Sequence, residues 1–98
     1  MAITTILDMH FKPEAVDEAP ALLKGILDDT RAFDGCLGVK VIQDKDDPAH
    51  LIAVEEWESL EKDAAYREWR AGDGAAVELH PLLSDGLNLT VGATLTDV

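Results

Sequence analysis

The chain has 98 residues, 47% of them hydrophobic, which is enough for one core and predicts a single domain over residues 1–98. Its 20 acidic and 8 basic side chains give a formal net charge of -12, and the acids are spread along the whole chain. A nucleic acid or an anionic membrane surface would require a basic patch, which no stretch supplies, so neither is an expected partner.

The first half of the chain predicts a strand and a helix. β-Branched and apolar residues predict a strand over Ile3–Phe11, and Pro13 then interrupts the extended run. Apolar residues at spacings of three and four predict an amphipathic helix over Glu14–Phe33. Because Pro20 removes a backbone hydrogen bond inside this range, we expect either a kink there or a late start near Ala19.

A hairpin and a second helix follow. The stretch FDGCLG marks a loop, and Leu37–Asp44 is the second predicted strand. The polar stretch DKDDPAH predicts a turn before a third strand over His50–Trp57, so that the two strands pair in an antiparallel hairpin. Ser59 is a suitable N-cap for a helix over Leu60–Arg70, because its hydroxyl can accept a hydrogen bond from a first-turn amide.

The last segment contains breaks and one regular strand. Gly72 and Gly74 end the second helix, and Ala75–Leu79 can form one or two further turns before the His80-Pro81 dipeptide ends them. Strict alternation of apolar and polar residues then predicts a strand over Gly86–Leu95.

The order strand, helix, strand occurs twice. Two such units with right-handed crossovers give an α+β, ferredoxin-like βαββαβ sandwich, with a four-stranded antiparallel sheet and both helices on one face. The second and third strands carry apolar residues on both faces, although two helices can cover only one. We therefore expect a homodimer in which the second face packs against another copy of the chain.

The segment FDGCLGVKVIQDKDDPAHLIAVEEWESLEKDAAYREW resembles the antibiotic biosynthesis monooxygenase domain, a member of the dimeric α+β barrel superfamily. The family pattern has a glycine-rich turn before strand two, an acidic Asp-Pro hairpin, and a strand that ends in Glu-x-Trp-x-Ser. The residues assigned to this pattern are Gly35, Cys36, Gly38, Pro48, Glu56, Trp57 and Ser59.

The resemblance implies a cofactor-independent monooxygenase that oxidises a quinol- or anthrone-like aromatic substrate with dioxygen. An electron-rich substrate, once deprotonated, can itself pass an electron to dioxygen, so no metal, flavin or other cofactor is implied. The protein then has to bind the ring, accept a proton and stabilise an anion. A small apolar or aromatic ligand, held between the sheet and its helices, is the expected partner.

Two residues are catalytic candidates. Histidine side chains exchange protons near neutral pH, and His80 is the candidate base nearest in sequence to Trp69; its structural alternative is to meet free carbonyls at a helix end. Alternation alone places Asp8 on the second face of the sheet. The resemblance instead implies that Asp8 lies in the pocket, because haem-degrading relatives carry a pocket asparagine at this position.

Four residues are candidates for substrate binding. Tyr66 and Trp69 are three residues apart on one helix face, where they serve either as core or as pocket wall, and the resemblance implies the pocket for Trp69. His10 shares the side of the first strand on which Asp8 lies. Along the third strand Glu55 and Trp57 point to one face and Glu56 points to the other, so one of the two glutamates must face inward. Glu56 is included as a candidate on this ground.

Two other functions remain open. A non-catalytic dimeric ligand-binding or accessory module would fit the acidic surface. Haem degradation is a minor alternative, because the family's iron-ligand position holds Glu78 instead of histidine, and Asp8 replaces the asparagine. No metal site is predicted, because the scattered histidines, His10, His50 and His80, lack the spacing of metal ligands.

The sequence also predicts a cytoplasmic location. Its start, MAITTILDMHF, has neither the basic region nor the cleavage site of a secretory signal, and no apolar run approaches the roughly 20 residues that span a bilayer. The single cysteine, Cys36, cannot form an internal disulfide and is predicted to be a small buried residue rather than a nucleophile.

Overall fold

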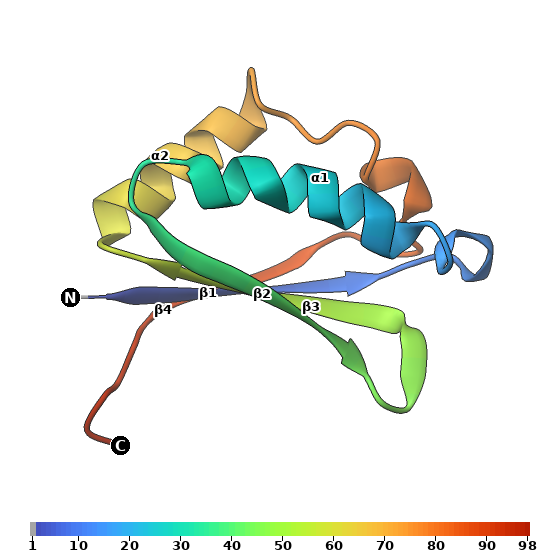
Figure 1. Ribbon diagram of the computed structural model, residues 1–98, viewed down its shortest axis with the longest axis horizontal. Helices are drawn as coiled ribbons and strands as arrows, with labels where there is room; N and C mark the ends of the chain where they lie inside the picture. The colour runs from blue at the N-terminus through green and yellow to red at the C-terminus, as the bar shows by residue number, and fades with distance from the viewer. Residues whose placement is uncertain (1) are drawn as a thin grey trace.

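Two helices lie across one face of a four-stranded antiparallel sheet in the computed structural model, which describes residues 2–98 (Figure 1). The sheet order is β2-β3-β1-β4, which confirms the predicted ferredoxin-like fold. No helix among residues 2–98 has the length and apolar character required to cross a membrane. In chain order the elements are β1 (Ile3–His10), η1 (Pro13–Ala15), α1 (Ala19–Ala32), β2 (Cys36–Asp44), β3 (Asp47–Trp57), α2 (Leu60–Ala71), η2 (His80–Leu82) and β4 (Asn88–Ala93).

Helix α1 begins at Ala19, so the late start is confirmed and a continuous helix from Glu14 is wrong. Residues Pro13–Ala15 form a separate 3-10 turn before it. Pro20 lies in the first turn of α1, where a backbone amide has no helical partner to lose, so the helix tolerates it without a break.

The hairpin between β2 and β3 is tighter than the sequence predicted. Strand β3 begins at Asp47 rather than His50, because aspartate side chains bind the backbone of the turn. Oδ1 of Asp44 accepts a hydrogen bond from the Asp46 amide at 2.9 Å, and Oδ1 of Asp47 accepts one from the Ala49 amide at 3.0 Å. Polar residues that suggested a long loop therefore stabilise a short one.

The junction between β3 and α2 packs against the turn that precedes β2. Gly35 has a φ of +91°, and a Cβ there would lie 2.4 Å from the Cβ of Lys62, so only glycine fits. The Gly35 carbonyl accepts a hydrogen bond from the Glu58 amide at 2.9 Å. Ser59 caps α2 as predicted, its Oγ accepting from the Lys62 amide at 3.3 Å.

The segment after α2 differs in detail from the prediction. Residues 77–79 form a hydrogen-bonded turn, in which the Leu79 amide donates to the Ala76 carbonyl at 3.1 Å, and η2 follows at His80–Leu82, so His80 begins a helical turn instead of ending one. Strand β4 is also shorter than Gly86–Leu95, covering Asn88–Ala93. It pairs along β1, with Leu89 opposite Leu7, and so brings the end of the chain beside its beginning.

The two faces of the sheet have different surroundings. On the covered face, alternate residues of β1 and β3 are buried beneath the helices, including Met9 and Trp57 at 1% and 0% exposure. The other face, which we call the open face, has no helix over it (Figure 1). Its centre is apolar and consists of Ile6, Ile42, Ile52 and Val54, which pair with one another across β1, β2 and β3.

Candidate active site

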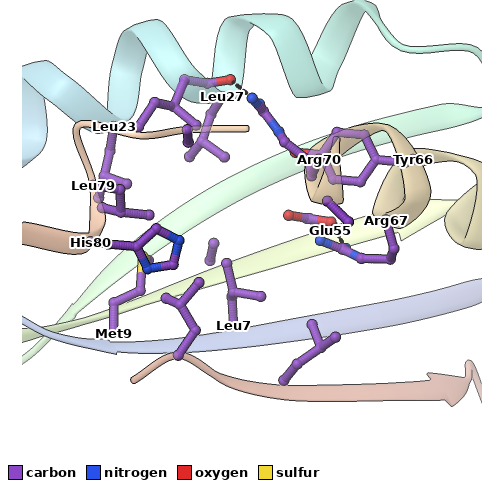
Figure 2. Close-up of a pocket in the computed structure, with 16 residues that line it drawn as sticks. Leu7, Met9, Leu23, Leu27, Glu55, Tyr66, Arg67, Arg70, Leu79 and His80 are labelled. Carbon is purple, nitrogen blue, oxygen red and sulfur yellow. Dashed lines mark hydrogen bonds and ion pairs between the residues drawn. The ribbon is translucent and has the colours of Figure 1, made fainter. Parts of the chain in front are cut away.

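A cavity of about 260 Å³ lies between the covered face of the sheet and the two helices (Figure 2). Most of its wall is aliphatic, and its polar side chains come from β3, α2 and η2. Exposed side chains at its edge, Leu87, Leu89 and His80, mark where it reaches the surface. The remaining lining residues are Leu7, Met9, Leu23, Ile26, Leu27, Ala53, Glu55, Tyr66, Arg67, Arg70, Ala71, Ala76 and Leu79.

A network of charged side chains forms one end of this cavity. Glu55 is 1% exposed, and its Oε1 accepts hydrogen bonds from Arg67 Nη2 and, at 3.1 Å, from the indole Nε1 of Trp57. Arg67 Nη2 also reaches Asp63 at 3.3 Å, and Asp63 accepts from the Thr5 hydroxyl at 2.8 Å. One arginine therefore lies between two buried carboxylates at the cavity wall.

Arg70 also lines the cavity, but its donors are used within the fold. Its Nε donates to the Tyr66 hydroxyl at 2.7 Å, and Nη1 and Nη2 donate to the carbonyls of Gly74 and Ile26. Nη2 also reaches the Thr30 hydroxyl at 3.1 Å. Arg70 thus ties α2 to α1 and to the loop beyond α2, so its guanidinium stabilises the wall.

Two of the predicted site residues, Tyr66 and His80, line the cavity. Tyr66 is 3% exposed, and its hydroxyl lies 2.6 Å from that of Thr30, so its ring forms wall while its polar tip is satisfied by the protein. Figure 2 shows His80 near Met9 and Leu79, at the opposite end of the cavity from Glu55 and Arg67. The cavity therefore has an imidazole at one end and an ion-pair network at the other.

Trp69 lies outside this cavity. Its ring packs against Phe33 with centroids 5.4 Å apart, and the Arg70 guanidinium lies 4.7 Å from its centroid. Gly74 approaches so closely that a Cβ there would be 2.2 Å from the indole. Trp69 instead lines a shallower groove between α1 and α2, together with Glu78, so the structure does not join it to His80.

Asp8 and His10 lie on the open face, so the placement of Asp8 in the pocket is wrong and the alternation pattern was the better guide. The side chain of Asp8 bonds His50 Nε2 at 2.8 Å, while His50 Nδ1 bonds Asp44 at 3.0 Å. The ring of His10 stacks on that of His50 with centroids 4.3 Å apart. The inward residues of this part of β1 are Leu7 and Met9.

The pKa of His50 is raised by the two carboxylates that flank its ring. The hydrogen bond to Asp44 contributes most, and the hydrogen bond to Asp8 contributes next. The same bond lowers the pKa of Asp44. These contacts therefore favour the charged form of the His50 imidazole and the ionised form of Asp44 on the open face.

The position of Glu56 in the pocket is also wrong. Its carboxylate accepts from the Thr4 hydroxyl at 2.9 Å on the open face, whereas Glu55 faces the cavity. In the Glu-x-Trp-x-Ser pattern the glutamate lies two residues before the tryptophan. The residue two positions before Trp57 is Glu55, so the pattern assigns Glu55 rather than Glu56. Arg67 was missed altogether, although its spacing of four residues from Asp63 places both on one helix face.

Cys36 begins β2 and is partly buried beside Trp57. Burial is the largest cause of its raised pKa, which disfavours the nucleophilic thiolate. Within residues 2–98 no three histidine, cysteine, aspartate or glutamate side chains are grouped so as to hold a metal ion.

Comparisons with known proteins agree with this fold. A family model described as antibiotic biosynthesis monooxygenase matches residues 2–76. No curated protein matches the sequence.

Solved structures of other proteins have the same fold. A protein from Mycobacterium tuberculosis is 26% identical with a TM-score of 0.78, over 97% of this chain and 96% of its own. A candidate antibiotic biosynthesis monooxygenase from Deinococcus radiodurans is 25% identical with a TM-score of 0.79, over 100% and 96%. One from Nitrosomonas europaea, at 14% identity, has a TM-score of 0.82 over 95% and 98% and shows the fold alone.

Proposed function

The chain belongs to the antibiotic biosynthesis monooxygenase family, and on this basis we propose that it is a cofactor-independent monooxygenase that oxidises a quinol- or anthrone-like aromatic substrate with dioxygen. The observation that carries the proposal is the apolar cavity between sheet and helices, with one titratable group at its edge and a polar network at its far end. An aliphatic wall suits an aromatic ring, and the few polar groups can orient its substituents.

The volume of the cavity favours the smaller substrates in this class. An apolar cavity of about 150 Å³ accommodates benzene. At about 260 Å³, the present cavity has space for one or two fused rings but is small for the three rings of an anthrone. A quinol with one or two rings therefore fits better than an anthrone.

His80 is the proposed base. Removal of a hydroxyl proton by its imidazole would leave an electron-rich anion that can reduce dioxygen. In the overall reaction of a quinol, one oxygen atom becomes a new ring hydroxyl and the other leaves as water, while the ring is oxidised to the quinone. All four electrons come from the substrate, so the balance requires no external reductant.

Oxygen uptake by metal-free protein tests the proposal, with a panel of hydroquinones and dihydroxynaphthalenes as substrates. We expect uptake above that of buffer, and a His80→Ala variant should lower kcat by roughly a hundredfold to ten-thousandfold. The matched control is His50→Gln, because His50 lies on the open face and does not line the cavity. Uptake that never exceeds that of buffer across the panel would contradict an oxygenase.

The second candidate is a non-catalytic ligand-binding or accessory module. The same cavity supports it, because ring binding alone requires no base. A thermal shift with aromatic compounds in the absence of any oxygen uptake would favour this function over the first. Haem degradation, the minor alternative, predicts a shifted Soret band when haem is titrated into the protein, and an unshifted band removes it.

We also propose that the protein is a homodimer joined through the open face. The apolar centre of that face supports this, since Ile6, Ile52 and Val54 have no helix over them. Sedimentation at micromolar concentration should give twice the monomer mass of 10.6 kDa, and a Val54→Lys variant should sediment closer to the monomer. A wild-type protein that sediments at 10.6 kDa would overturn the dimer.

A further inference from the structure

Glu55 has one carboxylate oxygen that the fold does not use. Both hydrogen bonds that it accepts, from Trp57 and Arg67, end on Oε1. No donor among residues 2–98 reaches Oε2, although the residue is 1% exposed and lines the cavity. Arg67 Nε is the fully buried side-chain polar atom that lacks a partner in the described chain, so Glu55 Oε2 keeps some accessible surface, through which a ligand in the cavity could donate a hydrogen bond to it.

Arg67, beside Glu55, has hydrogen-bond donors that the described chain does not use. Only Nη2 of its guanidinium has hydrogen-bond partners in the described chain, namely Glu55 and Asp63. Nε is buried without a partner, and the side chain, 24% exposed, also lines the cavity. Arg70, by contrast, has all three of its nitrogens engaged by the protein.

We propose that Glu55 and Arg67 form a hydroxyl-binding subsite at the end of the cavity away from His80. A phenolic hydroxyl there donates its proton in a hydrogen bond to Glu55 Oε2, while its oxygen faces the guanidinium of Arg67. The inference deepens the proposed function and rests on it, since it names the group by which the cavity would recognise a quinol substrate.

The charges around the subsite set its selectivity. The carboxylates of Glu55 and Asp63 are balanced in formal charge by Arg67 and Arg70, but the donors of Arg70 are all engaged by the protein and Glu55 Oε2 accepts no hydrogen bond from the described chain. A ligand carboxylate would be repelled, and a ketone or ether offers no proton to Oε2. The subsite therefore favours a ring hydroxyl over the corresponding carbonyl, which distinguishes a phenolic substrate from a quinone product.

The binding test uses unreactive ring compounds and the whole protein. Isothermal titration calorimetry compares 2-naphthol with 2-methoxynaphthalene, naphthalene and 2-naphthoate, all of two-ring size. We expect 2-naphthol to bind roughly tenfold to a hundredfold more tightly than 2-methoxynaphthalene, because only the phenol can donate to a charged acceptor. The naphthoate should be the weakest ligand.

Neighbouring glutamates on opposite faces provide a matched pair of variants. In Glu55→Gln the amide can donate to an ether as well as accept from a phenol, so the preference should fall below about threefold. Glu56→Gln, on the open face, should keep the wild-type preference. Circular dichroism shows whether the Glu55→Gln variant is folded. If it is not, the affinities of the wild type for the four naphthalene compounds decide whether the subsite exists.

The outcomes separate this inference from the proposed function. Equal affinities of the wild type for phenol and ether would overturn the subsite, even if the protein consumes oxygen. The same holds if no naphthalene compound binds at its solubility limit. A preserved preference for the phenol in a protein that oxidises nothing would support the subsite while the oxygenase fails.

Discussion

The two faces of the sheet each carry a cluster of charged groups, one built from β3 and α2 and the other from β1, β2 and β3. On the covered face, Glu55 and Asp63 share Arg67 beside a cavity. On the open face, Asp8 and Asp44 share His50. A step of one residue along β3, from Glu55 to Glu56, changes the surroundings from the interior to the other face.

The difference shows that residue type alone does not locate the site. Both clusters have acids around a cation, but only the first combines burial with adjacent apolar space. The side chains of Glu55 and Asp63 are 1% and 4% exposed, whereas those of Asp8 and Asp44 are 29% and 33% exposed. Within a single chain water reaches the second cluster, so its charges require less compensation from the fold of the monomer.

The largest effect is expected from removal of Arg67. An Arg67→Ala variant leaves two buried carboxylates without their cation, which should lower the free energy of unfolding by about 3–5 kcal/mol. Urea denaturation measures the loss. The control on the open face, Glu56→Ala, should cost about 1 kcal/mol or less. Similar losses in the two variants would contradict the difference between the faces.

A smaller effect is expected from adjacent threonines of β1. Thr5 is fully buried and donates to Asp63, so Thr5→Val should cost about 1–3 kcal/mol of unfolding free energy. Thr4 donates to Glu56 on the open face, and Thr4→Val should cost less than about 1 kcal/mol. Thermal or urea unfolding of both variants tests this, and a reversed order would contradict the assignment of faces.

The smallest effect is a dependence of stability on pH that arises from His50. Its pKa is raised by Asp44 and then Asp8, so its stabilising contribution is complete below about pH 6.5 and is lost as the pH rises through the folded-state value. The lowered pKa of Asp44 gives a contribution that is lost as the pH falls through its own folded value.

The measurement is the urea midpoint of the wild type and of His50→Gln between pH 4 and pH 9. The difference between the two proteins should be greatest near pH 5 to 6 and should shrink toward pH 9. Asp8, Asp44 and the stacked His10 are the titratable groups that contact His50. A difference that grows with rising pH would show that His50 is not held as a cation.

Most of the fold could be predicted from the order and periodicity of the sequence. Alternation along β3 correctly placed Glu55 with Trp57 on one face and Glu56 on the other, because a strand with one covered face fixes its register, but it left open which glutamate faces inward. The bounds were less accurate where side chains compete with general preferences. Asp44 and Asp47 bind the hairpin backbone and shorten the turn, which residue-type preferences do not reveal.

The site was predicted only in part. His80 and Tyr66 line the cavity as expected, whereas Asp8 was placed there by a position in relatives, against its own alternation pattern. Arg67 was not predicted, because an arginine on a helix that carries as many acidic as basic side chains resembles a surface residue. Its burial depends on Glu55, a strand residue twelve positions away, and only the packed structure brings the two together.

Nuclear magnetic resonance can locate the ligand site directly, because each face of the sheet and the groove between α1 and α2 contain an aromatic side chain whose chemical shift can be followed. The Trp57 indole Nε1–H donates a hydrogen bond to Glu55 on the covered face. The Trp69 indole lies in the groove between α1 and α2, and the His50 ring lies on the open face. On titration with 2-naphthol, we predict shifts of the Trp57 indole and of the His80 ring, with little change at Trp69 and His50. Shifts confined to His50 and Trp69, with Trp57 unchanged, would contradict a site on the covered face.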